Sequence, residues 1–338
     1  MGLFLGTMTD PFLEGRGQAG VQSTGVMAFA AASASAANDP NRAYAMLAGE
    51  PVQAYEPRWS VWGAGFGGSQ STDGNATVGS NNTTSNIAGT AVGADYLISP
   101  NTLVGFALAG GGTGFSVANG GSGRSDLFQA GAYARQSLGA AYLSAALAYG
   151  WQDITTNRTV AVAGLDQLRA QFNANAFAGR SEGGYRFVAP FTDGFGITPY
   201  AAAQFTMFDL PGYAEHAIVG TSNFALAYGA KNVNDSRSEL GLRTDQSWAF
   251  ADSILTLRGR FAWAHDFDPD RSIAATFQSL PGASFVVSGA AQAANTALAT
   301  ASVETKWKNG WSAAVTFEGE FSAVTQSYAG KGVVRYQW

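Results

Sequence analysis

The stretch Tyr328-Ala-Gly-Lys-Gly-Val-Val-Arg-Tyr-Gln-Trp338 decides the fold. In an extended strand, one face would carry Tyr328, Gly330, Gly332, Val334, Tyr336 and Trp338. The other face would carry Lys331, Arg335 and Gln337, with Val333 among them. A strand with one apolar and one charged face suits a closed barrel that stands in lipid and encloses a wet interior. We therefore expect the apolar set to face lipid.

Four runs upstream repeat this alternation. In the run near 233–248, Arg237 falls on the face opposite to Leu240 and Leu242, and in the run near 254–267, Arg258 falls opposite to Phe261. Charges of both signs share such faces, and we expect them to line the lumen, pair across strands and hydrate the pore. These residues are Arg237, Glu239, Arg243, Arg258, Arg260, Glu304, Lys306, Glu318, Lys331 and Arg335. Runs upstream of residue 210 are richer in Gly and Ala, and their faces cannot be assigned.

Composition removes several classes of protein. The chain has 338 residues, 43 Gly, no Cys, 13% charged residues and a net charge of -5. No cysteine-ligated metal site or disulfide scaffold can exist, and the acidic balance argues against a nucleic-acid partner. Helical spans need about 18 to 20 consecutive apolar residues, and no such stretch occurs. A membrane barrel remains, because alternating strands leave the average hydropathy neutral.

Twelve strand-like runs fill residues 57–338, the predicted barrel. They fall near 57–69, 87–98, 101–114, 124–137, 140–153, 169–188, 196–209, 233–248, 254–267, 296–307, 311–319 and 327–338. Long polar connections are expected at 69–86, 154–168, 210–232 and 268–295, and tight turns at 99–100, 138–139 and 308–310. This alternation of short turns and long loops is typical of an outer-membrane barrel with both ends in the periplasm. Seven of the eight tryptophans lie at predicted strand ends, and Trp62 does not.

Residues 1–56 differ in composition and are read as a linker with a pore helix. Asp39 is a candidate N-cap before Pro40, residues such as Arg42 and Tyr44 follow, and Gly49 is a stop signal. We predict a helix at 40–48, which residues 25–37 could extend upstream. So short a helix is marginal alone, and we expect it inside the pore. The start at Met1 lacks the features of a signal peptide, so we infer that the natural N-terminus lies further upstream.

Candidate chemistry is sparse. Gly63 to Gly68 fits G-x-G-x-x-G but lies within a strand, and Asp266, Asp268 and Asp270 lack the glycine and glutamate of a calcium loop. We expect no metal and no cofactor. Asn38-Asp39 is a candidate junction for self-cleavage, but we favour the helix-capping role of Asp39. We expect no enzyme activity.

Four segments resemble a known family. They are Asp10-Pro-Phe-Leu-Glu-Gly-Arg16, Tyr55-Glu-Pro-Arg-Trp-Ser-Val-Trp-Gly-Ala-Gly-Phe-Gly-Gly68, Ala262-Trp-Ala-His-Asp266 and Tyr328 to Trp338. Over residues 10–338 the chain resembles the C-terminal translocator domain of classical monomeric autotransporters, the proteins of type V secretion. The resemblance implies a twelve-stranded antiparallel transmembrane β-barrel with an α-helix in its pore, in the outer membrane of a Gram-negative bacterium.

The resemblance also implies partners. These are an N-terminal passenger exported to the cell surface, periplasmic chaperones, outer-membrane lipid, and the barrel assembly machinery, which would recognise Val334, Tyr336 and Trp338. We expect a monomer. Two alternatives stay open: a passive porin plugged by residues 1–56, and an outer-membrane hydrolase that would use His265 beside Asp266.

Overall fold

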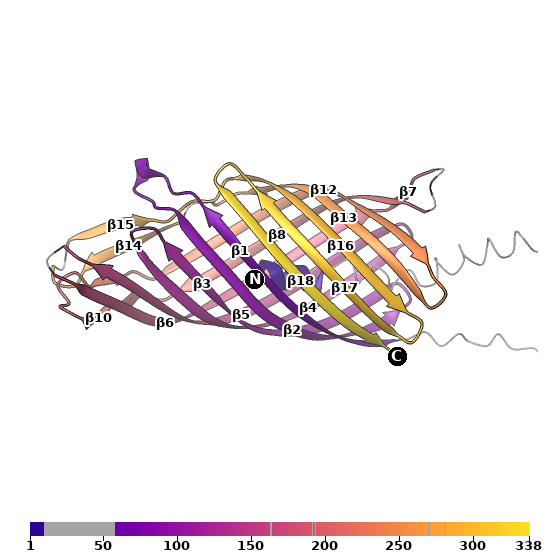
Figure 1. Ribbon diagram of the computed structural model, residues 1–338, viewed down its shortest axis with the longest axis horizontal. Helices are drawn as coiled ribbons and strands as arrows, with labels where there is room; N and C mark the ends of the chain where they lie inside the picture. The colour runs from indigo at the N-terminus through magenta and orange to yellow at the C-terminus, as the bar shows by residue number, and fades with distance from the viewer. Residues whose placement is uncertain (10–57, 163, 191, 193, 270, 281) are drawn as a thin grey trace, which may run out of the picture.

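Twelve long antiparallel strands close into one barrel (Figure 1), as predicted. The computed structural model describes residues 1–9 and 58–338, apart from 163, 191, 193, 270 and 281. The barrel strands are β1 (Trp59–Thr72), β2 (Thr83–Ser99), β3 (Thr102–Val117), β4 (Gly121–Leu138), β5 (Ala141–Val160), β6 (Asp166–Tyr185), β8 (Gly196–Leu210), β12 (Lys231–Ala249), β13 (Ser253–Asp266), β16 (Asn295–Trp307), β17 (Trp311–Phe321) and β18 (Thr325–Gln337). Each strand pairs with its neighbour in the chain, including β6 with β8.

The barrel closes between its first and last strands. β1 pairs with β18 from Ser60 opposite Gln337 to Thr72 opposite Thr325. Trp59 and Trp338 exchange backbone hydrogen bonds of 3.2 and 3.1 Å. Both ends of the barrel therefore lie at the same rim, which we call the terminal end, and the opposite rim is the loop end.

The outer surface is apolar. Large side chains on alternate positions are exposed, among them Leu240 (55%), Phe261 (67%) and Val315 (63%). Seven tryptophans also face outward, whereas Trp62 points inward and is 5% exposed. The tryptophan that did not fit the expected interface positions is therefore part of the lumen.

The predicted long connection at 154–168 is mostly strand, and strands extend into both ends of the one predicted at 69–86, so these bounds were wrong. β5 runs on to Val160, β6 begins at Asp166, β1 ends at Thr72 and β2 begins at Thr83. Polar residues such as Asn157 looked like loop, yet Asn157 pairs with Arg169. Where a strand extends beyond the lipid, water wets both of its faces, and the alternation that identifies it in a sequence disappears.

The loop end is oblique and partly covered. β5 and β6 have 20 residues each and β17 has 11, so one side of the rim stands higher (Figure 1). The connections 211–230 and 267–294 form a four-stranded sheet, which we call the cap sheet. Its strands, in spatial order, are β15 (Ser284–Ser288), β14 (Ser272–Phe277), β11 (Leu226–Tyr228) and β9 (Tyr213–Ala214). The shorter elements are β7 (Phe187–Val188), β10 (His216–Val219), which pairs with β6, and the 3-10 turn η2 (Ala76–Val78).

The cap sheet leans on the inner face of the high rim. Tyr213 stacks on Phe172 of β6 with ring centroids 3.9 Å apart. Arg158 of β5 donates to both oxygens of Glu215, at 2.9 and 2.5 Å, and the Leu226 backbone N–H donates to Glu215 at 2.9 Å. Burial raises the pKa of the Tyr213 phenol to about 12, and the Glu215 carboxylate adds to the rise. The cap sheet is therefore held on the β5–β6 side of the opening.

One helix, α1 (Gly2–Met8), lies inside the barrel (Figure 1). No helix was predicted for these residues. The predicted helix at 40–48, with Asp39, Pro40, Arg42, Tyr44 and Gly49, falls outside the described residues and stays a prediction. In the part of the chain that is described, no helix is long and apolar enough to span a membrane.

The outward face of β13 supplies a test of the lipid-facing surface. Phe261→Arg would place a charge near the middle of the strand, and we expect a loss of about 2–4 kcal/mol in the free energy of unfolding from lipid. Urea titration of vesicle-inserted protein measures it. Ser302→Arg, on the lumen face of the neighbouring β16, is the control and should cost much less. Equal losses would mean that the two faces are wrongly assigned.

Candidate functional site: the barrel lumen

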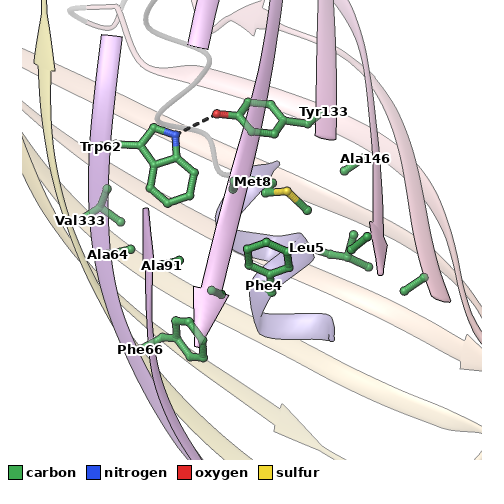
Figure 2. Close-up of a cluster of buried hydrophobic side chains, with 14 of the residues drawn as sticks. Phe4, Leu5, Met8, Trp62, Ala64, Phe66, Ala91, Tyr133, Ala146 and Val333 are labelled. Carbon is green, nitrogen blue, oxygen red and sulfur yellow. Dashed lines mark hydrogen bonds between the residues drawn. The ribbon is translucent and has the colours of Figure 1, made fainter. Parts of the chain in front are cut away.

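One half of the lumen is an apolar seat for α1. Phe4, Leu5 and Met8 are 1%, 0% and 0% exposed, and they pack in one cluster with lumen-facing residues (Figure 2). α1 lies against β4, β5 and β6. The wall offers small side chains there: Ala91, Ala107, Ala109, Ala146, Ala148 and Ala178. Small residues leave the space that a helix needs in a barrel of this size.

The fit depends on a glycine of β4. A Cβ at Gly131 would lie 2.7 Å from Met8 Cε and 2.8 Å from its Sδ, so the thioether occupies the volume that a side chain would fill. The two threonine hydroxyls of this segment are satisfied by backbone carbonyls of α1. Thr7 and Thr9 donate their hydroxyls to the carbonyls of Leu3 and Leu5, at 2.8 and 2.9 Å. These two hydroxyls are therefore buried with a hydrogen-bond acceptor each.

A buried hydrogen-bond chain borders the seat toward the terminal end. Trp62 Nε1 donates to the Tyr133 hydroxyl at 2.8 Å (Figure 2). Tyr133 donates in turn to Asp95, and Ser60 Oγ donates to the other Asp95 oxygen at 2.6 Å. The chain joins β1, β2 and β4 across the strand that separates β2 from β4, so it braces the wall beside the seat.

The opposite half of the lumen is charged. Arg180 of β6 donates to both oxygens of Glu239, each at 2.8 Å, and to Glu182 at 2.9 Å. Arg243 also donates to Glu182, at 2.8 Å, and Tyr142 donates to the same carboxylate at 2.6 Å. All four charged groups are at most 9% exposed. Such a network fixes side chains from β5, β6 and β12 relative to one another.

Further ion pairs follow the wall around the barrel. Arg237 binds Glu320 and donates to Thr296 at 2.7 Å, and Arg258 binds Glu304. Lys331 lies 4.0 Å from Glu318. Arg260 Nε donates to Thr300 at 3.1 Å, and its Nη1 lies 3.9 Å from Glu239. Lys306 shares the face of β16 with Glu304, and Arg335 is 4% exposed.

A cavity of about 310 Å³ separates the helix from this charged wall. α1 contributes Gly2, Leu3, Gly6 and Thr9 to its lining. The barrel contributes charged residues of β6, β12, β13, β17 and β18. The lumen therefore has two halves, one that holds an apolar helix and one that is polar and open.

Part of this site was not predicted from the sequence. Arg180 and Glu182, two residues apart and thus on one face of β6, were not assigned because that run could not be phased. Glu320 and the whole α1 seat were not predicted either. The signal that could have found Arg180 and Glu182 is their opposite charge at the period of a strand. No sequence signal marks a seven-residue apolar helix such as α1 as a pore occupant.

The candidate hydrolase pair separates in the structure. His265 faces outward, where its Nδ1 lies 3.0 Å from Asn295, whereas Asp266 is 4% exposed and lies 3.4 Å from Arg237. Consecutive strand residues point to opposite sides, so the two cannot act on one substrate. Over the described ranges, no group of three or more possible ligands is placed to hold a metal.

A closed barrel with an apolar outer face, a charged lumen and a helix inside it is a transmembrane pore with an occupied channel. The sequence matches the family model for the autotransporter beta-domain over residues 61–318, which is more than half of the chain. The chain therefore belongs to the autotransporter beta-domain family.

Solved structures show the same fold. The translocator domain of the autotransporter NalP from Neisseria meningitidis has a TM-score of 0.65 at 14% identity, over 85% of this chain and 90% of that one. The beta domain of the Bordetella autotransporter BrkA has a TM-score of 0.62 at 18% identity, over 83% and 100%. The transport unit of AIDA-I from Escherichia coli has a TM-score of 0.50 at 13% identity, over 88% and 96%. A search of curated proteins found no match.

Family membership confirms the class expected from the resemblance. The barrel is a pore in a bacterial outer membrane through which a passenger domain is exported, and translocator domains of this family are not enzymes.

The seat can be tested on the helix itself. Leu5→Lys would bury an ammonium group among alanines, which costs several kcal/mol unless the group is paired, so we expect α1 to leave its seat and single-channel conductance in planar bilayers to rise. Leu3→Lys is the matched control, because Leu3 lines the polar cavity. If both variants conduct like the parent chain, α1 does not restrict the pore.

The charged network predicts that replacing both members of an ion pair costs less stability than replacing one. Glu239→Gln leaves Arg180 buried without its bidentate partner, and we expect a loss of about 3–5 kcal/mol in the free energy of unfolding. Replacing both partners, Arg180→Met with Glu239→Leu, should restore most of that loss. Urea unfolding in detergent measures both. A double variant that is less stable than the single one would contradict this account.

Proposed function

We propose that the chain exports its passenger through the polar half of the lumen to the surface of a Gram-negative cell, and that α1 then restricts the pore. The supporting observation is the seated helix: Leu5 is fully buried in the barrel while a cavity of about 310 Å³ stays open beside it. An unfolded chain carries water with it, and a polar wall of mixed charge offers it hydrogen bonds without a large apolar surface. A porin would have no use for an apolar seat matched to one helix.

The charged residues of the lumen have a proposed double role. They offset the cost of their own burial by pairing across strands, as Arg180 does with Glu239, and they keep the conduit hydrated. The set is Arg237, Glu239, Arg243, Arg258, Arg260, Glu304, Lys306, Glu318, Lys331 and Arg335.

We propose that residues 1–56 form a linker and pore segment and that 57–338 form the barrel, which acts as a monomer. β18 is the proposed signal for the barrel assembly machinery and its chaperones. Val334 and Trp338 are 49% and 42% exposed, and the Tyr336 ring stacks on Trp338 with centroids 5.8 Å apart. Insertion that slows in Trp338→Ala but not in Trp307→Ala, an equally exposed tryptophan of β16, would support this role.

We propose no cleavage at Asn38-Asp39, where the capping role of Asp39 is favoured. Mass spectrometry of the purified protein that finds an N-terminus at Asp39 would contradict this.

Export can be tested with a reporter. A signal peptide and a soluble reporter domain are fused ahead of Met1, and the reporter is expected to be digested by protease on intact cells. The matched control lacks residues 325–338, so its barrel cannot close and the reporter should stay protected. A reporter that stays protected although the complete barrel is heat-modifiable in the outer membrane would exclude the export function and favour the porin alternative.

A further inference from the structure

The cavity beside α1 carries an excess of positive charge on its surface. Six cationic side chains line it, against four carboxylates. The cations are Arg180, Arg237, Arg243, Arg258, Arg260 and Lys331. A low-dielectric wall focuses the field of its charges into the aqueous space that it encloses.

Two of the ion pairs present their cation, and not their carboxylate, to the cavity. Arg243 and Arg258 line the cavity, whereas their partners Glu182 and Glu304 are absent from the described lining residues. Their positive ends therefore face the water, and their negative ends lie behind them. Of the carboxylates that do line the cavity, Glu239 and Glu320 each accept two hydrogen bonds from an arginine. Their charge is largely compensated by these bonds.

Arg260 lies further from a carboxylate than Arg180, Arg237, Arg243 and Arg258, which each hydrogen-bond to one. It lies directly opposite Arg243 in the register of β12 and β13, so two guanidinium groups share one level of the wall. Its Nε donates to Thr300, and Nη1 lies 3.9 Å from Glu239, which Arg180 already binds at both oxygens. Like charges directly opposite each other repel, and this is unfavourable. An anion bound at the cavity side of the two guanidinium groups would relieve the repulsion.

The cavity is long enough to act on a passing ion. Along β12 its lining runs from Arg237 to Asp245, roughly 26 Å at about 3.3 Å per residue. With a tilt of about 45°, this covers roughly 19 Å of the pore axis, most of the hydrocarbon thickness. An ion that crosses the pore therefore stays beside this wall for most of its path.

We propose that this half of the lumen is an anion site, where the Nη atoms of Arg260 bind small inorganic anions such as chloride while α1 is seated. The barrel then conducts anions in preference to cations after export has ended. This activity goes beyond export and does not depend on which passenger the chain carries.

The test is the reversal potential of the full chain in planar bilayers under a KCl gradient. We expect an anion-to-cation permeability ratio above one. The Arg260→Gln substitution lowers the excess positive charge of the cavity lining from two to one. The permeability ratio should then fall about halfway toward unity. The preference should be larger near 0.1 M salt, where the screening length is about 10 Å, than near 1 M, where it is about 3 Å. A cation preference, or no current at all through the folded chain, would overturn the proposal.

Three further variants separate charge from damage to the fold. Arg260→Lys keeps the charge and should keep the preference, whereas Glu318→Gln removes a weakly paired lining carboxylate and should raise the ratio. Arg169→Gln changes an arginine of β6 whose Nε donates to Asn157 outside the lumen, and it should leave the ratio unchanged. An unchanged reversal potential in Arg260→Gln, with normal conductance, would also refute the role of Arg260.

Discussion

The whole structure depends on the pairing of backbone groups in a medium that offers them no water. In hydrocarbon an unpaired N–H or C=O costs several kcal/mol, so a sheet can stand there only if its first and last strands meet. Here β1 and β18 meet over their full length, from Ser60 opposite Gln337 to Thr72 opposite Thr325. Closure creates an inside, and the inside then has to be filled or hydrated. One half of the lumen is filled by a helix, and the other half is hydrated.

The apolar half is filled by the chain's own helix, and the charged half is hydrated and held by ion pairs. Burying Leu5 and Met8 against alanines supplies hydrophobic free energy without any directed bond. Arg180, Glu182 and Glu239 are desolvated and depend on good geometry to offset that cost. The first half therefore holds the helix by apolar packing, and the second half is held in shape by directed bonds. This division suits a pore whose occupant changes while its wall does not.

Much of the fold could be predicted from the sequence, and the reason for the failures is physical. The twelve strands and the lipid faces of the later strands follow from alternation, as in Val315 and Phe317 of β17. The upstream strands could not be phased, because α1 makes their inner face apolar too: Ala107 faces the helix and Phe106 faces lipid. The polar ends of β5 and β6 were taken for loop because they stand in water. α1 itself is too short for periodicity to identify, and the predicted helix at 40–48 lies outside the described residues.

The oblique loop end leaves one side of the barrel mouth more open than the other. With the cap sheet anchored on β5 and β6 by Arg158 and Glu215, the unobstructed side of the mouth is the low one, where β17 joins β18 through residues 322–324. A domain tethered to this barrel would stand off-centre above that low edge. It would leave the tall edge, with exposed Val162 and Leu165, open to neighbouring molecules at the cell exterior.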